Sequence, residues 1–141
     1  MKPLKDTKRA SVRVGFDGRV HKHFLGPFAK ERYQNEIRVL HYLEEGNCPF
    51  VPKVLECHDD DLYLVTSNCG HIVESLSSDR IRRLFSDLES YGVRHDDPFP
   101  RNVTYHPRLG RFCIIDFEFA VILETGEGLT IADLTARQKE Q

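Results

Sequence analysis

Apolar and polar residues alternate along residues 11–24 with the period of two that is typical of a β-strand. Asp17-Gly18 interrupts the alternation and is a favoured turn sequence, so this segment is predicted to form a β-hairpin. The residues that share a face are Val12, Val14 and Phe16 on the first strand and Val20, Lys22 and Phe24 on the second. A lysine on such a face is costly to bury unless an anion meets it. The alternative is that its aliphatic stem lies along the core edge while its ammonium reaches water.

Apolar residues spaced three and four apart predict two helices. The first covers residues 28–43, and the second begins at the capping residues Ser78-Asp79. Their apolar stripes are Tyr33, Ile37, Leu40 and Leu43 in the first helix and Ile81, Leu84, Phe85 and Leu88 in the second. Glu36 flanks the first stripe, where it either meets Lys22 of the hairpin or pairs with Arg32 on its own helix.

Other short apolar runs predict strands at residues 50–55, 61–66 and 119–123. Two more runs, residues 103–105 and 112–115, flank a connection that contains proline and glycine, which predicts a second β-hairpin. The predictions for the two ends are a solvated basic tail that includes Lys2, Lys5, Lys8 and Arg9, and a short polar helix over residues 131–138.

The second hairpin brings polar side chains together at its open end. If Tyr105 faces Phe112, counting outward places Asn102 opposite Ile115 and beside Asp116, with Asp97 on the loop just before. An amide oxygen and a carboxylate then converge on one point. Mg²⁺ is held by few protein oxygens where a phosphate-bearing substrate and water supply the rest. Asn102 and Asp116 are therefore predicted to hold a magnesium ion.

Composition narrows the classes of partner. The chain has 141 residues and a formal net charge of −2, which indicates one domain and argues against nucleic acid as a partner. Its longest apolar run, residues 112–123, contains Asp116 and Glu118 and is too short to span a membrane. The four cysteines show neither a zinc nor a disulfide spacing, and the N-terminus has no signal-peptide pattern. We expect a cytoplasmic protein that does not engage a membrane.

The residues of the second hairpin resemble those of a known superfamily. His95, Asp97 and Asn102 match the H-x-D-x-x-x-x-N catalytic loop of the protein kinase-like superfamily. Asp116-Phe117-Glu118 is similar to its metal-binding D-F-G, and with glutamate to the corresponding segment of choline and ethanolamine kinases. The resemblance implies an α+β fold of the truncated two-lobed kinase type within a single domain, residues 1–141. Residues 11–67 would form an antiparallel sheet with one helix, and residues 71–141 a reduced, mostly helical lobe with the catalytic hairpin.

The resemblance also implies roles for individual residues. Asp97 would accept or orient the proton of an attacking hydroxyl, while Asn102 and Asp116 would hold Mg²⁺ or Mn²⁺ on ATP. Lys22 and Glu36 resemble the pair that positions the α- and β-phosphates. Further residues with implied roles are Thr66, Ser67 and Asn68 at the adenine edge, Arg101 near the γ-phosphate, and His95 as a brace beneath the site. Arg101 could instead be a surface residue of the hairpin.

Three features depart from the family pattern. No glycine-rich loop precedes Lys22, because Gly15 and Gly18 lie in the hairpin itself. Asp96 stands where protein kinases carry the arginine that reads a phosphorylated activation loop, and Phe99 replaces the catalytic-loop lysine. These departures keep a second function class open.

The leading hypothesis is an ATP-dependent phosphotransferase that moves the γ-phosphate to a hydroxyl of a protein or small molecule. The alternative is a pseudokinase or nucleotide-binding module that regulates a partner without efficient catalysis. A homodimer could complete the reduced second lobe in trans. A third hypothesis is a metal site at His21 and His23, which share a strand face.

Overall fold

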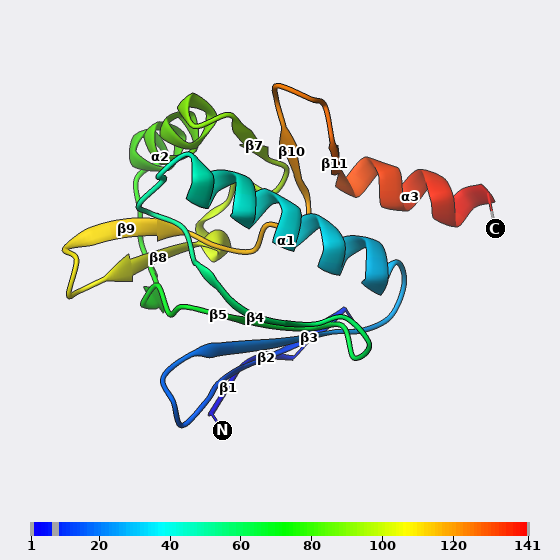
Figure 1. Cartoon of the computed structure of the whole chain (residues 1–141). Coiled ribbons are helices and arrows are strands. Elements are labelled where there is room, and N and C mark those ends of the chain that lie inside the picture. The colour runs from blue at the N-terminus through cyan, green and yellow to red at the C-terminus, as the bar shows by residue number, and fades with distance from the viewer. Residues whose placement is uncertain (1, 7–8, 141) are drawn as a thin grey trace.

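A five-stranded antiparallel sheet forms one side of the molecule (Figure 1). The computed structural model describes residues 2–6 and 9–140 and has an α+β fold. The strands of this sheet are β1 (Lys2–Asp6), β2 (Ala10–Val14), β3 (Val20–Phe24), β4 (Val54–His58) and β5 (Tyr63–Thr66), in the order β1-β2-β3-β5-β4. Because β3 lies at the centre of the order, its inward-facing side chains reach the middle of the molecule.

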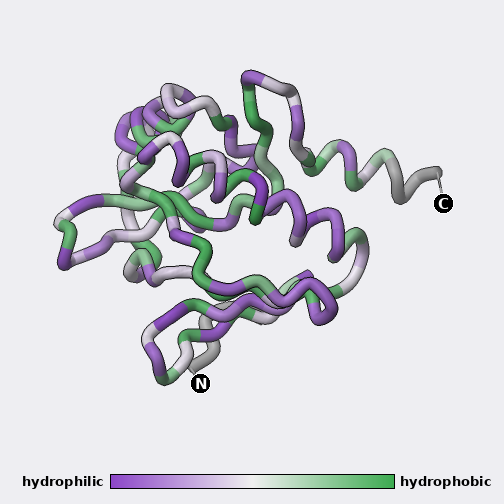
Figure 2. Tube along the Cα trace, viewed as in Figure 1, coloured by the Kyte–Doolittle hydropathy of each residue, from purple (hydrophilic) through white to green (hydrophobic). Residues whose placement is uncertain are grey.

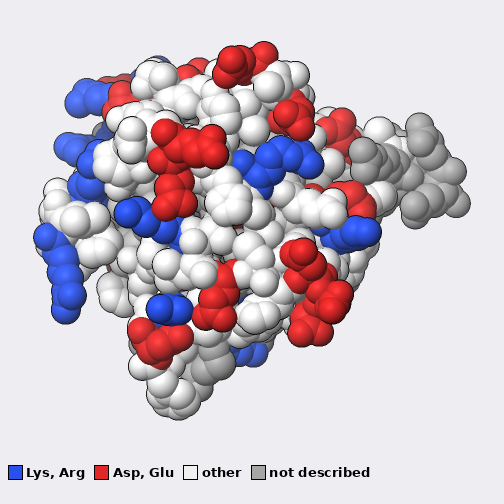
Figure 3. All heavy atoms as spheres, viewed as in Figure 1, with Lys and Arg blue, Asp and Glu red and all other residues white. Residues whose placement is uncertain are grey.

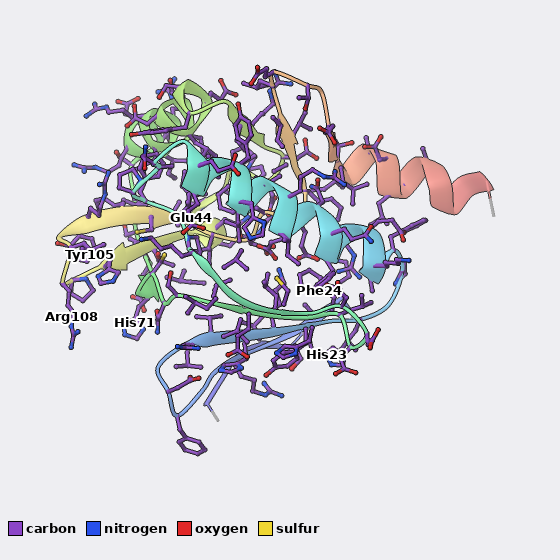
Figure 4. All side chains as sticks on the ribbon, in the orientation of Figure 1. His23, Phe24, Glu44, His71, Tyr105 and Arg108 are labelled. Carbon is purple, nitrogen blue, oxygen red and sulfur yellow. The ribbon has the colours of Figure 1, made fainter. Side chains whose placement is uncertain are left out.

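The predicted alternation along β3 is confirmed. Phe24 is 2% exposed and Lys22 is 9% exposed, whereas His23 between them is exposed. Figure 4 shows the labelled Phe24 on the side of the sheet that faces helix α1, and His23 on the other side. The predicted position of Phe16 is wrong, because β2 ends at Val14 and a five-residue loop follows. The amide of Gly18 donates to the carbonyl of Gly15 in that loop, and Phe16 is 98% exposed.

Two predictions need correction, one for the N-terminus and one for a strand. The predicted basic tail is wrong for the first residues, because they form β1, which pairs with β2 in an antiparallel register that joins Lys2 to Val14. Lys8 lies outside the described residues. The strand predicted at residues 50–55 starts only at Val54, after Pro52. A proline cannot donate to the ladder, so the buried Phe50 and Val51 pack into the core from irregular backbone.

Helix α1 (Ala29–Glu45) packs across the inner face of the sheet (Figure 1). The trace in Figure 2 alternates between apolar and polar colours along this helix, as expected of a helix with one apolar stripe. Of the predicted stripe, Tyr33, Leu40 and Leu43 are buried, and Ile37 is half-buried. Three polar residues, Arg32, Asn35 and Glu36, are also buried. This helix therefore carries charge into the core along with its apolar stripe.

The second half of the chain combines two helices with two small antiparallel sheets. The helices are α2 (Ser78–Ser90) and α3 (Ile131–Glu140), with a 3-10 turn at Pro100–Asn102. One sheet joins β11 (Gly128–Leu129), β10 (Ala120–Ile122) and β7 (Val93–His95), and the other joins β6 (His71–Ile72), β8 (Val103–His106) and β9 (Arg111–Ile114). This half holds more strand than the mostly helical arrangement that we expected. The α2 cap is Ser77, one residue earlier than predicted, whose hydroxyl accepts from the amide of Arg80.

The surface mixes both signs of charge. On the face shown in Figure 3, acidic and basic side chains lie close to one another over most of the molecule. No helix in the described part of the chain is long and apolar enough to cross a membrane. All four cysteines are free, and Cys57 is exposed whereas Cys48, Cys69 and Cys113 are buried.

Gly70, between β5 and β6, is predicted to tolerate no side chain. Its φ is +96°, and a Cβ there would lie 1.9 Å from the carbonyl oxygen of Tyr105. Gly110 has a φ of +63° but open space around it. Gly70→Ala should therefore lower the free energy of unfolding by at least about 2 kcal/mol more than Gly110→Ala does. Urea unfolding followed by circular dichroism measures both, and equal losses would contradict this account.

Candidate functional site

The hairpin of β8 and β9 has the register that the sequence predicts. Tyr105 pairs with Phe112 and Val103 with Ile114, and the amide of Ile115 donates to the carbonyl of Asn102 at 2.9 Å. Asp116 follows directly, with a φ of +65° that is uncommon for a residue other than glycine. Such backbone conformations are often kept at functional sites. The open end of the hairpin thus presents Asn102 and Asp116 to the same cavity.

Asp97 is tied into this end of the hairpin by two neighbours. The side-chain amide of Asn102 donates to the Asp97 carboxylate at 2.8 Å and to its carbonyl at 2.9 Å. The Arg101 guanidinium donates to both carboxylate oxygens, through Nε at 2.8 Å and through a terminal nitrogen. This hydrogen bonding raises the pKa of Arg101. Arg101 is a surface residue, with a side chain that is 60% exposed, and its head lies on Asp97. Its predicted role near the γ-phosphate stays a prediction.

His95 fixes the loop from beneath. Its Nδ1 accepts from the amide of Asp97 at 2.9 Å, and its Nε2 lies 3.0 Å from the carbonyl oxygen of Ile115. Since a carbonyl can only accept, Nε2 carries the proton. Burial lowers the pKa of His95 against the opposing hydrogen bond to Ile115, which keeps the ring neutral near pH 7. The ring thereby connects the end of β7 and the loop at Asp97 to the residue that follows β9, as expected of a brace.

Lys22 meets three carboxylates in the core. Its Nζ donates to Glu36 at 2.8 Å, to Asp116 at 3.1 Å and to Glu118 at 3.1 Å. Burial alone would lower the pKa of Lys22, but the charges of Asp116, Glu118 and Glu36 raise it well above its ordinary value. The alternative in which the ammonium reaches water is therefore wrong.

Glu36 pairs with Lys22, and the alternative pairing with Arg32 is wrong. Its second oxygen accepts from the amide of Phe117 at 2.7 Å, which ties α1 to the segment after β9. Burial raises the pKa of Glu36, and Lys22 opposes that shift. Helix α1 thus contributes one fixed anion to the cluster.

Two buried polar residues of α1 were missed from the sequence. Arg32 is fully buried and donates to Glu118 at 2.6 Å. The Asn35 side chain donates to the carbonyls of Glu118 at 2.9 Å and Ala120 at 3.1 Å. A signal for Arg32 exists in the sequence, because it stands four residues before Glu36 and so shares the helix face that turns inward.

A cavity of about 530 Å³ opens beside the cluster, within the range of sites for small ligands. Val12, Val20, Leu40 and Leu64 supply apolar walls. Further lining residues are Thr66, Ser67 and Asn68 on one side and Lys22, Asn102 and Asp116 at the polar end. An elongated ligand with a flat apolar part and a polar end suits this distribution.

The oxygen donors fit a hard cation of the magnesium type. Among the described residues, no group of three or more histidine, cysteine or acidic side chains could hold a metal ion. The prediction concerns a different donor set, since Asn102 gives an amide oxygen and Asp116 a carboxylate. Mg²⁺ takes one or two protein carboxylates and completes its shell with phosphate and water. The chemistry of these donors matches that preference.

Among the described residues, His21 and His23 have no such set of ligands around them. Nitrogens of His21 lie 2.9 Å from the Tyr63 hydroxyl and 3.3 Å from the carboxylate of Asp17, while His23 lies exposed on the same face of the sheet. These contacts join His21 to its neighbours on the sheet. The described residues therefore do not support a metal site at His21 and His23.

Asp96 has a contact that the sequence did not predict. Its carboxylate accepts from the amide of Ile131 at 2.7 Å, at the first residue of α3, and its own amide donates to the carbonyl of Phe119 at 2.9 Å. The residue before Asp97 therefore holds α3 and the β10 segment next to the loop. A carboxylate at a helix N-terminus is a favourable electrostatic pairing.

The neutral His95 ring gives a prediction for stability against pH. A histidine with a lowered pKa in the folded state contributes stability that is present above its unfolded pKa of about 6.5 and lost as pH falls through the folded value. The contribution of His95 to the free energy of unfolding should therefore be smaller at pH 5 than at pH 7.5. His95→Gln should be less stable at pH 7.5 but lose less on acidification. Chemical unfolding measures the free energy of unfolding of both proteins at each pH. An equal loss in the unmodified protein and in His95→Gln would refute this prediction.

Comparison of the sequence with protein-family models and with curated proteins returned no match. The function of the site therefore has to be inferred from its own residues. Those residues are the polar cluster around Lys22, the loop around Asp97, and the cavity that both adjoin.

Proposed function

We propose that this chain is an ATP-dependent phosphotransferase of the protein kinase-like type, with a truncated two-lobed fold. One observation carries the proposal: Lys22 and Glu36 form a buried ion pair whose ammonium also contacts Asp116, at the polar end of a cavity that Asn102 also lines. A lysine and glutamate from a strand and a helix, beside an aspartate and an asparagine, are the parts that such enzymes use on phosphates.

The charge of the cluster supports a cationic ligand at this end. Glu36, Asp116 and Glu118 are three carboxylates, whereas Lys22 and Arg32 are two cations, so these five side chains carry one net formal negative charge. Asn102 and Asp116 would hold Mg²⁺ or Mn²⁺. When bound, the ion would neutralise charge on the β- and γ-phosphate oxygens.

The chain's own residues would do the positioning. Lys22 already points its ammonium at the position of Asp116, so it can donate to phosphate oxygens there. The adenine would lie between the apolar walls, with backbone groups of residues 66–68 at its edge. Asp97 would receive the acceptor hydroxyl, in an orientation fixed by Asn102 and Arg101. Such reactions are accelerated mainly by positioning and by charge stabilisation.

A specific observation favours the second candidate, a nucleotide-binding module without efficient catalysis. Both carboxylate oxygens of Asp97 are engaged by Arg101. A hydroxyl that approaches Asp97 must share or displace these contacts. Binding of nucleotide without turnover would distinguish the module from the enzyme.

Two substitutions test the assignment. Asp97→Asn should reduce transfer of labelled phosphate from ATP at least about 100-fold, because the carboxylate that receives the proton is lost, while ATP with Mg²⁺ still raises the melting temperature. Asp116→Asn should reduce both transfer and the stabilisation by nucleotide, since the metal ligand is lost. Asp87→Asn, on the exposed face of α2, is the matched control and should behave as the unmodified protein.

The measurements are phosphate transfer to water, to the protein itself and to a panel of hydroxyl acceptors, together with thermal unfolding with and without ATP and Mg²⁺ or Mn²⁺. Stabilisation without any transfer would favour the nucleotide-binding module. If ATP causes no stabilisation and no phosphate is transferred, both proposals are rejected.

A further inference from the structure

Arg32 is held in one orientation by backbone groups. Its exposed fraction is 0%, and it does not line the cavity. Its guanidinium donates to the carbonyls of Pro27 at 3.0 Å and Arg9 at 3.1 Å, and also to that of Leu25. These carbonyls lie just before β2 and in the connection between β3 and α1. The planar fork of an arginine can serve several acceptors at fixed angles, so this guanidinium is fixed independently of any carboxylate.

Glu118 connects Arg32 to Lys22. One of its oxygens accepts from Arg32 at 2.6 Å, and the other accepts from Lys22 at 3.1 Å. A carboxylate bound at both oxygens cannot rotate without giving up one of its partners. The position of the Lys22 ammonium therefore depends on a side chain that lies on the far side of Glu118 from the cavity.

The three carboxylates that contact Lys22 differ in how firmly their other partners hold them. Glu36 is held by the amide of Phe117 at 2.7 Å, and Glu118 is held by Arg32. Asp116 lines the cavity, and its side chain is 24% exposed, the most accessible of the three. If Asp116 turned to a ligand, Glu36 and Glu118 would still hold the ammonium from two directions. The third N–H could then donate to an anionic group.

We propose that Arg32 is a positioning residue, which acts through Glu118 to hold the Lys22 ammonium where it meets phosphate. This inference rests on the proposed function. Arg32 touches neither nucleotide nor acceptor, so its loss should act on the orientation of Lys22 more than on the binding of nucleotide. A lysine at position 32 would keep the charge but could not reach three carbonyls and a carboxylate together.

The first test compares Arg32→Lys and Glu118→Gln with Arg83→Gln, an exposed arginine on α2. The first two variants should lose about 10-fold or more in kcat per folded molecule, with KM for ATP changed by less than about 3-fold, because a small misplacement of a positioning group acts on the reacting geometry. The control should keep both values. A merely structural role would lower the melting temperature and leave kcat per folded molecule unchanged, and that result would overturn the proposal. If Arg32→Lys does not fold, the isosteric Glu118→Gln decides the same question.

A second measurement needs no enzymatic activity. The buried ammonium of Lys22 should give a slowly exchanging signal in ¹⁵N-edited NMR, assigned by its loss in Lys22→Met. Arg32→Gln and Glu118→Gln should each shift or broaden this signal, whereas Arg83→Gln should leave it unchanged. An unchanged signal in the first two variants would overturn the link between Arg32 and Lys22. If the unmodified protein neither binds ATP nor transfers phosphate, the proposed function fails, and the NMR result still decides whether Arg32 positions Lys22.

Discussion

The burial of the Lys22 ammonium is the constraint on which the rest of the structure depends. Transfer of an unpaired charge into a protein core costs many kcal/mol, so a lysine at the centre of a sheet must be met by anions. Lys22 is 9% exposed, and its three carboxylate partners come from α1 and from the segment after β9. The sheet, the helix and the hairpin can be brought together only in an arrangement that delivers these carboxylates. The same ion pairs that permit burial therefore also set the relative positions of the groups at the end of the cavity.

A single cation would not balance the charge of three carboxylates, of which Glu36 and Glu118 are buried, and Arg32 supplies the second cation. The two cations alternate with the anions, so Glu118 lies between Arg32 and Lys22, and Lys22 lies between Glu118, Glu36 and Asp116. Charged hydrogen bonds in such a network support one another at low effective dielectric, and the loss of one member leaves another charge unpaired. Such a network fixes geometry more than it adds stability. Fixed geometry is what the positioning of a phosphate requires.

The local spacing of apolar residues predicted the features of the fold that depend on neighbours in the sequence. The inward direction of Lys22, the apolar stripe of α1 and the register of the second hairpin all follow from spacings of two or of three and four residues. The burial of Arg32 was not predicted, because folding alone brings its partners to it. These partners are the carbonyls near residues 9 and 25–27 and the carboxylate of Glu118. The pairing of β1 and the contact of Asp96 with α3 were missed for the same reason, since neither has a local pattern.

The geometry of the site is determined more by the register of the second hairpin than by its sequence motif. Side chains on a strand alternate between faces, so a slip of one residue would turn each of them to the opposite face. With Tyr105 paired to Phe112, the last bond of the ladder joins Ile115 to Asn102, and Asp116 turns away with a φ of +65°. That turn directs Asp116 to Lys22, while Asn102 reaches back to Asp97. Because the ladder ends at this point, Asn102 contacts Asp97 and lines the same cavity as Asp116.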